Sequence, residues 1–227
     1  ARERIHSAKK IVFTGTPVKI QKREFSSEQK SKILNELGLS EKLPIVLIFG
    51  GSQGAQKINE AVVGILKEKL NQKYQIVWAT GPKQFDIVKE ELKKSSIDIE
   101  KVPNAKILPY IYNMEEIMNI SDIIVARSGA MTITEISNLG KPSILIPLPN
   151  VSKDHQLRNA EVLQKIGAAQ IILNNELEKD ILNKEIIEIA SNKAKMKEMG
   201  EKASTKSVKN VQEKIYAEIK KIVKGGK

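Results

Sequence analysis

The chain has 227 residues, of which 41% are hydrophobic, so it is long enough and apolar enough to bury a substantial core. Its 38 Lys and Arg against 27 Asp and Glu give a formal charge of +11, which favours anionic partners, but the aromatic content of 4% argues against nucleic acid. Cysteine is absent, which excludes disulfides, thiolate nucleophiles and cysteine-bound zinc.

Apolar segments of strand length alternate with helical patterns along most of the chain. The segments are apolar throughout, as in strands covered by helices on both faces, and this predicts an α/β fold with a Rossmann-like, doubly wound parallel sheet of about six strands. The predicted strands are 45–49, 75–80, 105–108, 122–126, 143–147 and 169–173. The predicted helices are 27–37, 55–70, 83–94, 113–119, 131–139 and 155–166.

The two ends differ from this core. Residues 1–22 contain a strand-like piece and a Gly/Pro turn, and we interpret them as a linker from another domain. Residues 23–205 form the predicted ligand-binding domain, and residues 206–227 form a C-terminal amphipathic helix and tail. The apolar stripe of that helix recurs every three or four residues and has a lysine-rich back; it consists of Val208, Val211, Ile215, Ile219 and Ile222. Packing on protein is its favoured role, and an anionic membrane surface is the alternative.

Two small-residue turns follow predicted strands and precede predicted helices. They are Gly50-Gly51-Ser52-Gln53-Gly54 and Arg127-Ser128-Gly129-Ala130-Met131-Thr132. In a parallel sheet both would lie at the carboxyl edge, where helix N-termini offer free N–H groups to an anion. The first turn has neither the lysine of a P-loop nor the G-x-G-x-x-G spacing, and a tight turn alone would explain its glycines. A phosphate-bearing ligand is the leading hypothesis.

Polar residues on two neighbouring helix starts are further candidates. Thr132 and Glu135 have the spacing of a capping box, but they could also bind a phosphate and a ribose diol. Gln156 and Asn159 share a helix face, so their amides are candidates for sugar hydroxyls. Asp154 lies just before them, and its side chain could simply cap the helix that starts there.

The motifs together resemble a known family, the peptidoglycan N-acetylglucosaminyltransferases of bacteria, the MurG type. The resemblance runs from about Thr14 to at least Gly167, and the motifs occur in the family's order. They are Gly50-Gly51-Ser52-Gln53-Gly54-Ala55, Arg127 to Glu135, Gly140-Lys141-Pro142, and Asp154-His155-Gln156 with Asn159-Ala160. The Thr-Gly-x-Pro-Val segment at 14–18 is similar to the family's crossing between two domains.

The resemblance implies the carboxyl-terminal half of a GT-B glycosyltransferase, which moves GlcNAc from UDP-GlcNAc to lipid I and forms lipid II with inversion. It implies that Ser52 and Thr132 contact the phosphates and that Glu135 binds the ribose. It also implies that backbone groups at Ile111 contact the uracil and that Gln156 and Asn159 contact the GlcNAc. Lys19 stands where the family often has arginine. The full implied UDP-GlcNAc site is Lys19, Gly51, Ser52, Gln53, Gly54, Ile111, Ala130, Met131, Thr132, Glu135, Gln156 and Asn159.

No metal and no cofactor are expected, and no catalytic residue is expected in this chain. The family's acceptor loops and general base belong to an amino-terminal domain that is absent here, so we expect this chain to bind the donor without transferring it. The resemblance further implies a cytoplasmic protein, peripheral on the cytoplasmic face of the plasma membrane, that acts in cell-wall synthesis and so in cell shape and division. A non-catalytic or split-partner UDP-sugar-binding subunit and, less favoured, a UDP-GlcNAc 2-epimerase are the alternatives.

Overall fold

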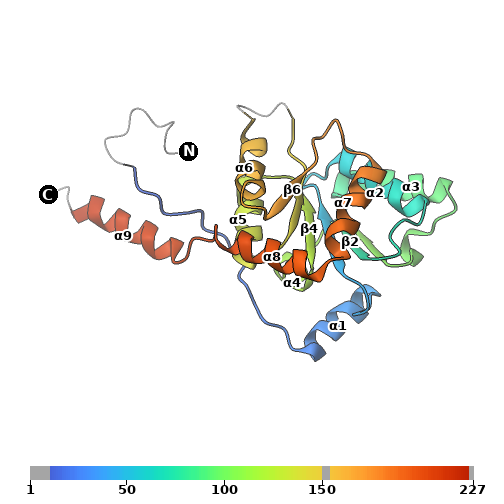
Figure 1. Ribbon diagram of the computed structural model, residues 1–227, viewed down its shortest axis with the longest axis horizontal. Helices are drawn as coiled ribbons and strands as arrows, with labels where there is room; N and C mark the ends of the chain where they lie inside the picture. Colours follow the sequence, from blue (N-terminus) through green and yellow to red (C-terminus); the bar gives the residue numbers. More distant parts are fainter. Residues whose placement is uncertain (1–10, 150–153, 225–227) are drawn as a thin grey trace.

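The computed structural model describes residues 11–149 and 154–224, and its centre is a six-stranded sheet with helices on both sides (Figure 1). The strand order is β3-β2-β1-β4-β5-β6, and every neighbouring pair is parallel. The strands are β1 (Ile45–Phe49), β2 (Gln75–Ala79), β3 (Ala105–Leu108), β4 (Ile123–Ala126), β5 (Ser143–Leu145) and β6 (Ala169–Ile171). The predicted doubly wound parallel sheet is confirmed.

Nine α-helices and a short 3-10 helix are present in the part of the chain that the structure describes. The six predicted helices are α1 (Ser27–Leu37), α2 (Gln56–Lys67), α3 (Pro82–Lys94), α4 (Met114–Ile120), α5 (Ala130–Leu139) and α6 (His155–Gln164). The others are η2 (Ile99–Lys101), α7 (Lys179–Ala190), α8 (Lys193–Ser204) and α9 (Val211–Lys224). The prediction 27–37 matches α1 at both ends, and the other predicted bounds differ from these by at most three residues, as expected where helix ends depend on caps rather than on apolar spacing.

Both faces of the sheet are covered, which explains why its strands are apolar throughout. All five residues of β1 are buried. Val46 and Ile48 pack in one cluster with side chains of α2, α3 and α7, whereas Leu47 and Phe49 pack in a second cluster with side chains of α1, α4, α5 and α6. Successive strand residues point to opposite faces, so a strand between two helix layers has no polar face.

The side chain of Lys141 caps the C-terminal end of α4. The amine of Lys141 donates to the carbonyls of Asn119 and Ser121, both at 2.6 Å, where α4 ends. These are the orphan acceptors of a helix C-terminus, which lysine side chains commonly satisfy. Burial lowers the pKa of Lys141 to about 8, although the charge of Asp122 acts in the opposite direction.

We therefore expect a pH-dependent contribution of Lys141 to stability. Between pH 8 and pH 10 the folded chain releases the Lys141 proton while the unfolded chain keeps it, so the free energy of unfolding should rise by about 2 kcal/mol. The neutral amine still has two N–H groups for the two carbonyls. Urea unfolding of the wild type and of Lys141→Met across this range measures the effect, and the rise should be missing in the variant. Parallel pH profiles would contradict it.

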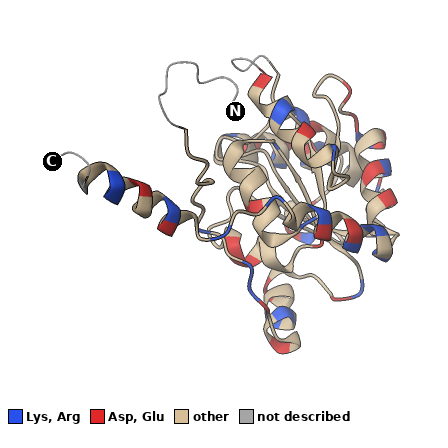
Figure 2. Ribbon diagram, turned by 60° about the vertical axis from the view of Figure 1, so that its left-hand side comes forward, with Lys and Arg blue, Asp and Glu red and all other residues tan. Residues whose placement is uncertain are grey.

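The N-terminal segment and α9 lie side by side and extend away from the body (Figures 1 and 2). Residues 11–24 form neither helix nor strand, so the strand-like piece near residue 12 is not a strand. A Cβ on Gly15 would lie 2.9 Å from side-chain atoms of Val208 and Val211, which shows how closely the two segments pack. Further along, the backbone N–H of Arg23 donates to Asn119 at 2.9 Å and so ties the segment to α4.

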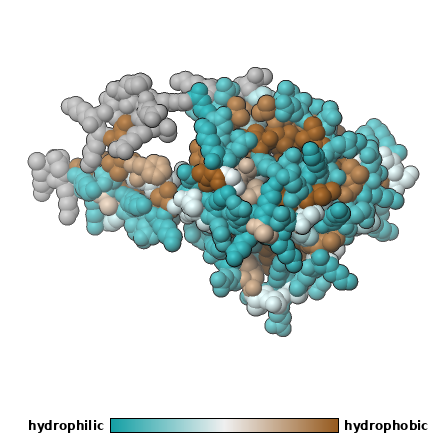
Figure 3. Space-filling view, viewed as in Figure 1, coloured by the Kyte–Doolittle hydropathy of each residue, from teal (hydrophilic) through white to brown (hydrophobic). Residues whose placement is uncertain are grey.

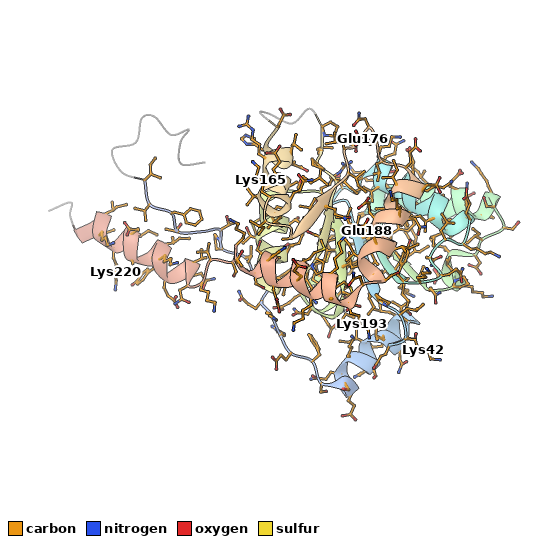
Figure 4. All side chains as sticks on the ribbon, in the orientation of Figure 1. Lys42, Lys165, Glu176, Glu188, Lys193 and Lys220 are labelled. Carbon is orange, nitrogen blue, oxygen red and sulfur yellow. The ribbon has the colours of Figure 1, made fainter. Side chains whose placement is uncertain are left out.

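The outer surface carries charges of both signs. Figure 2 shows basic and acidic positions interspersed on most helices, and the four lysines labelled in Figure 4, Lys42, Lys165, Lys193 and Lys220, are exposed and lie far apart in the chain. Exposed lysines spread over helix faces are solvated charges rather than one binding patch. No helix among residues 11–149 and 154–224 is both long enough and apolar enough to cross a membrane.

Candidate functional site

The candidate site lies where the strand order changes direction. β1 and β4 pair in the middle of the sheet, with Phe49 beside Ala126, although six other elements separate them in sequence. The two small-residue turns follow these two strands and therefore lie next to each other at the carboxyl edge. In open α/β sheets this switch point is where ligands bind.

The first turn is held against β2 by a close backbone approach. Gly54 has a φ of +78°, and a Cβ there would lie 2.2 Å from the carbonyl oxygen of Thr80. The buried side chain of Asn59 donates to the same carbonyl at 3.0 Å and accepts from the indole N–H of Trp78 at 3.1 Å. Turn, helix α2 and strand β2 are thus fixed to one another, with Ser52 and Gln53 exposed at the tip of the turn.

The helix that follows the second turn begins without a side-chain cap. Helix α5 begins at Ala130 with Gly129 as its N-cap and no side-chain capping bond, so the capping-box alternative for Thr132 and Glu135 is wrong. Thr132 is the third residue of the helix and Glu135 lies one turn further on the same face. Among the described residues neither side chain has a hydrogen-bond or ion-pair partner. Burial raises the pKa of the Glu135 carboxyl.

The start of α6 is tied to the second turn by side chains. The hydroxyl of Ser128 donates to the carbonyl of Gln156 at 2.8 Å, and the Asn159 amide donates to the carbonyl of Ser128 at 3.0 Å. The side-chain oxygen of Gln156 accepts from the backbone N–H of Leu148 at 3.0 Å. Gln156 keeps its amide N–H groups for a ligand, whereas one N–H group of Asn159 is already used. Asp154 occupies the N-cap position of α6, but its side chain makes no capping hydrogen bond. The interpretation of Asp154 as a side-chain helix cap is therefore wrong.

A cavity of about 480 Å³ lies between these turns. Of the predicted site residues, Gly51, Gly54, Thr132 and Gln156 line it. Its other lining residues are Phe49, Gly50, Ala55, Gln56, Lys57, Arg127, Gly129, Leu148 and Asn174. The volume suits part of a nucleotide sugar, since small-molecule sites start near 300 Å³.

The other predicted site residues do not line this cavity. Ala130 and Met131 are exposed in the first turn of α5, and Ile111 is buried in the segment between β3 and α4. Lys19 is exposed in the N-terminal segment and is not among the residues that line the cavity. Its assignment stays a prediction from the resemblance.

Nine of the thirteen residues that line the cavity were not predicted as contacts, among them Arg127, Lys57 and Asn174. Arg127 belongs to a sequence motif that predicts no contact for it, and no motif includes Lys57 or Asn174. The Asn174 side-chain oxygen is buried without a hydrogen-bond partner in the described structure. Lys57 carried a usable signal, because a lysine in the first turn of a helix opposes the helix dipole. The sequence offers no such signal for Asn174, because its position at the cavity depends on where β6 ends.

The described residues include no group of three or more His, Asp or Glu side chains placed to hold a metal ion.

The sheet order and the cavity at its switch point define the class: a doubly wound, Rossmann-like α/β domain with a cavity at the carboxyl edge of its sheet. Residues 45–215 match the family model described as the glycosyltransferase family 28 C-terminal domain. The chain belongs to glycosyltransferase family 28, of which it carries the C-terminal domain.

Individual relatives agree with this assignment and confirm the resemblance seen in the sequence. The chain is 38% identical over 223 residues to the UDP-N-acetylglucosamine–N-acetylmuramyl-(pentapeptide) pyrophosphoryl-undecaprenol N-acetylglucosamine transferase of Ruminiclostridium cellulolyticum, covering 98% of the chain and 60% of that protein. The crystal structure of Acinetobacter baumannii MurG matches with a TM-score of 0.68 at 29% identity, over 82% of this chain and 52% of that one. This structure identifies the domain as one half of a GT-B fold.

A putative UDP-N-acetylglucosamine 2-epimerase from Listeria monocytogenes shares the fold alone, with a TM-score of 0.59 at 16% identity over 92% of this chain and 50% of that one. The chain thus spans about 60% of the curated relative and about half of each solved structure.

Proposed function

We propose that this chain is the donor-binding domain of an N-acetylglucosaminyltransferase that uses UDP-GlcNAc and lipid I to form lipid II in peptidoglycan synthesis. The observation that carries the proposal is the cavity between the two glycine turns, where Thr132 and Gln156 line the wall. Glu135 lies one helix turn away and has no partner among the residues that the structure describes. The name of the 38% identical relative supports the choice of sugar and acceptor.

In the proposed site the UDP moiety lies across the starts of α2 and α5, with phosphates near Ser52 and Thr132. Free N–H groups at helix starts and hydroxyl donors suit a diphosphate, whose charge grows as the sugar departs. Glu135 accepts from the ribose hydroxyls, Ile111 offers backbone groups to the uracil, and Gln156 offers its amide N–H groups to the GlcNAc.

The reaction we propose for the whole protein is a direct displacement with inversion. The acceptor 4-hydroxyl oxygen forms a bond to the anomeric carbon, and the bond from that carbon to the phosphate oxygen breaks with its electron pair leaving on UDP. The hydroxyl proton passes to a general base, which must lie within about 3 Å of it. We place this base and the lipid I site in the part of the relatives that this chain does not match, so this chain alone should bind donor without transfer.

We propose that the exposed apolar side of α9 packs on that same part of the protein. Figure 3 shows apolar atoms along α9 beside polar ones, and four of its large side chains are exposed. They are Tyr216, Ile219, Ile222 and Val223. Val12 and Phe13 of the neighbouring segment are exposed as well. The alternative is that this apolar side lies on an anionic membrane surface. Sedimentation with anionic vesicles distinguishes packing on protein from binding to a membrane.

A cytoplasmic location at the inner face of the plasma membrane, with roles in cell shape and division, belongs to the same proposal. Nucleic acid is not a proposed partner.

Calorimetric titration with UDP-GlcNAc, UDP, UDP-galactose and ADP-glucose tests the donor site. We expect saturable binding of UDP ligands, with UDP-GlcNAc preferred over UDP-galactose and no binding of ADP-glucose. Binding of UDP ligands without any transfer by the intact protein would favour the second candidate, a non-catalytic or split-partner subunit. Formation of UDP-ManNAc would favour an epimerase, and absence of binding to every UDP ligand would refute the donor site.

A further inference from the structure

The walls of the cavity between the two glycine turns carry positive charge and no described acid. Arg127 and Lys57 are the only ionisable side chains among the described residues that line it, and they come from different elements: Arg127 directly follows β4, and Lys57 is the second residue of α2. Neither helix that begins at the cavity, α2 or α5, has an acidic residue in its first turn. An anion entering the cavity therefore meets no carboxylate on its walls.

Arg127 is a partly buried cation without a counter-charge. One of its guanidinium nitrogens donates to the carbonyls of Ile146 and Pro147, at 3.1 and 3.3 Å. It forms no ion pair with any described residue, and burial lowers the pKa of its guanidinium because nothing nearby offsets the cost of the charge. Carbonyl dipoles hold the group in place but do not neutralise it, and an uncompensated buried charge is costly. The remaining guanidinium N–H groups are free to donate to a ligand.

Lys57 stands in a place that is unfavourable for the fold itself. A cation in the first turn of a helix opposes the positive end of the helix dipole. Its only described ion pair is with Glu60 at 3.7 Å, and both side chains are about half exposed, at 50% and 52%. A pair of this kind contributes little. Lys83 holds the same position in α3, so Lys57 is distinguished by its place on the cavity wall, which makes it a candidate for ligand binding.

We infer that Arg127 and Lys57 are the two side-chain cations that face the diphosphate of the bound nucleotide in this chain, one from each wall of the cavity. The inference rests on the proposed donor site, and it adds which side chains supply positive charge to the diphosphate. Arg127 also positions the segment after β5 through its two carbonyl contacts, whereas Lys57 acts through charge alone.

The test compares the affinities of UDP, UMP and uridine by calorimetry for wild type, Lys57→Met, Arg127→Met, Arg127→Lys and a matched control, Lys83→Met. Lys83 is also the second residue of a helix that follows a strand of this sheet, α3, but it does not line the cavity. We expect Lys57→Met to weaken UDP binding by about fivefold and Arg127→Met by about 10- to 100-fold, with Arg127→Lys in between. Uridine affinity should change less than twofold in Lys57→Met, and Lys83→Met should match wild type throughout.

A role of Arg127 in folding alone would weaken UDP, UMP and uridine alike, and Lys57→Met would then decide, because its side chain is half exposed. If Lys57→Met and Arg127→Lys bind UDP as tightly as wild type, the inference is overturned and the donor site stands. If wild type binds none of the UDP ligands, the donor site and the inference both fall.

Discussion

Replacing Glu135 by alanine should weaken the binding of UDP and UDP-GlcNAc by about 10- to 100-fold without unfolding the domain. A carboxylate that accepts from two hydroxyl donors makes charge-assisted hydrogen bonds, and a hydrogen bond to a charged group contributes about 1.5 to 3 kcal/mol net. The side chain has no hydrogen-bond or ion-pair partner among the described residues, so its removal breaks no internal bond. Calorimetry measures the affinity, and thermal unfolding of the variant checks the fold.

The same residue should make binding sensitive to acid. Burial raises the pKa of the Glu135 carboxyl above its ordinary value of 4.5, so it takes up a proton at a higher pH than an exposed glutamate does. The protonated group is a poorer acceptor for the ribose diol, and UDP affinity should fall as pH drops through that raised pKa. Glu135→Gln should bind weakly at neutral pH and lose this part of the pH dependence.

Control measurements separate the ribose contact from a general effect on the cavity. 2′-Deoxy-UDP lacks one of the two hydroxyls, so wild type should bind it more weakly than UDP, while Glu135→Ala should hardly distinguish the two. Thr134→Ala is the matched protein control, because the Thr134 hydroxyl donates to the carbonyl of Ala130 within the same helix, at 2.8 Å. Equal discrimination between UDP and 2′-deoxy-UDP in wild type and Glu135→Ala would disprove the ribose assignment.

Most of the fold could be predicted from the sequence because its strands are unusually uniform. Ile45–Phe49 has five apolar residues in a row, and only a strand covered on both faces buries them all. Parallel strands and short connections then bring the two turns to one edge, even though Gly54 and Gly129 are far apart in sequence. The strand order, with β1 and β4 paired at its centre, needed the structure.

The site was less predictable because it depends on contacts between loops. The spacing of Thr132 and Glu135 is that of a capping box, and only the helix start at Ala130 removes that alternative. Asn59 binds the Thr80 carbonyl and the Trp78 indole, but in the sequence it is one polar residue within a mostly apolar helix face. Tertiary contacts, not local patterns, give such residues their roles.

Gly54→Ala should be the most damaging single-methyl substitution in the site. The new Cβ would lie 2.2 Å from the Thr80 carbonyl oxygen and 3.2 Å from the Gly81 Cα, and the φ of +78° is strained for any L side chain. The opposing backbone cannot give way easily, because Asn59 and the β2–β3 pairing hold it. We expect a loss of about 3 to 5 kcal/mol in unfolding free energy and a Tm lower by about 10 °C.

Gly51→Ala in the same turn provides the matched control. Gly51 has a φ of +87°, so the backbone strain is the same in kind, but a Cβ there would have no atom within 4 Å. Its cost should be about 1 to 2 kcal/mol, from the positive φ alone. Urea unfolding of both variants gives the difference, which isolates the collision with Thr80 from the strain. Equal destabilisation would mean that the turn moves away from β2 freely. The close approach of Gly54 to Thr80 would then not be what positions the first wall of the cavity.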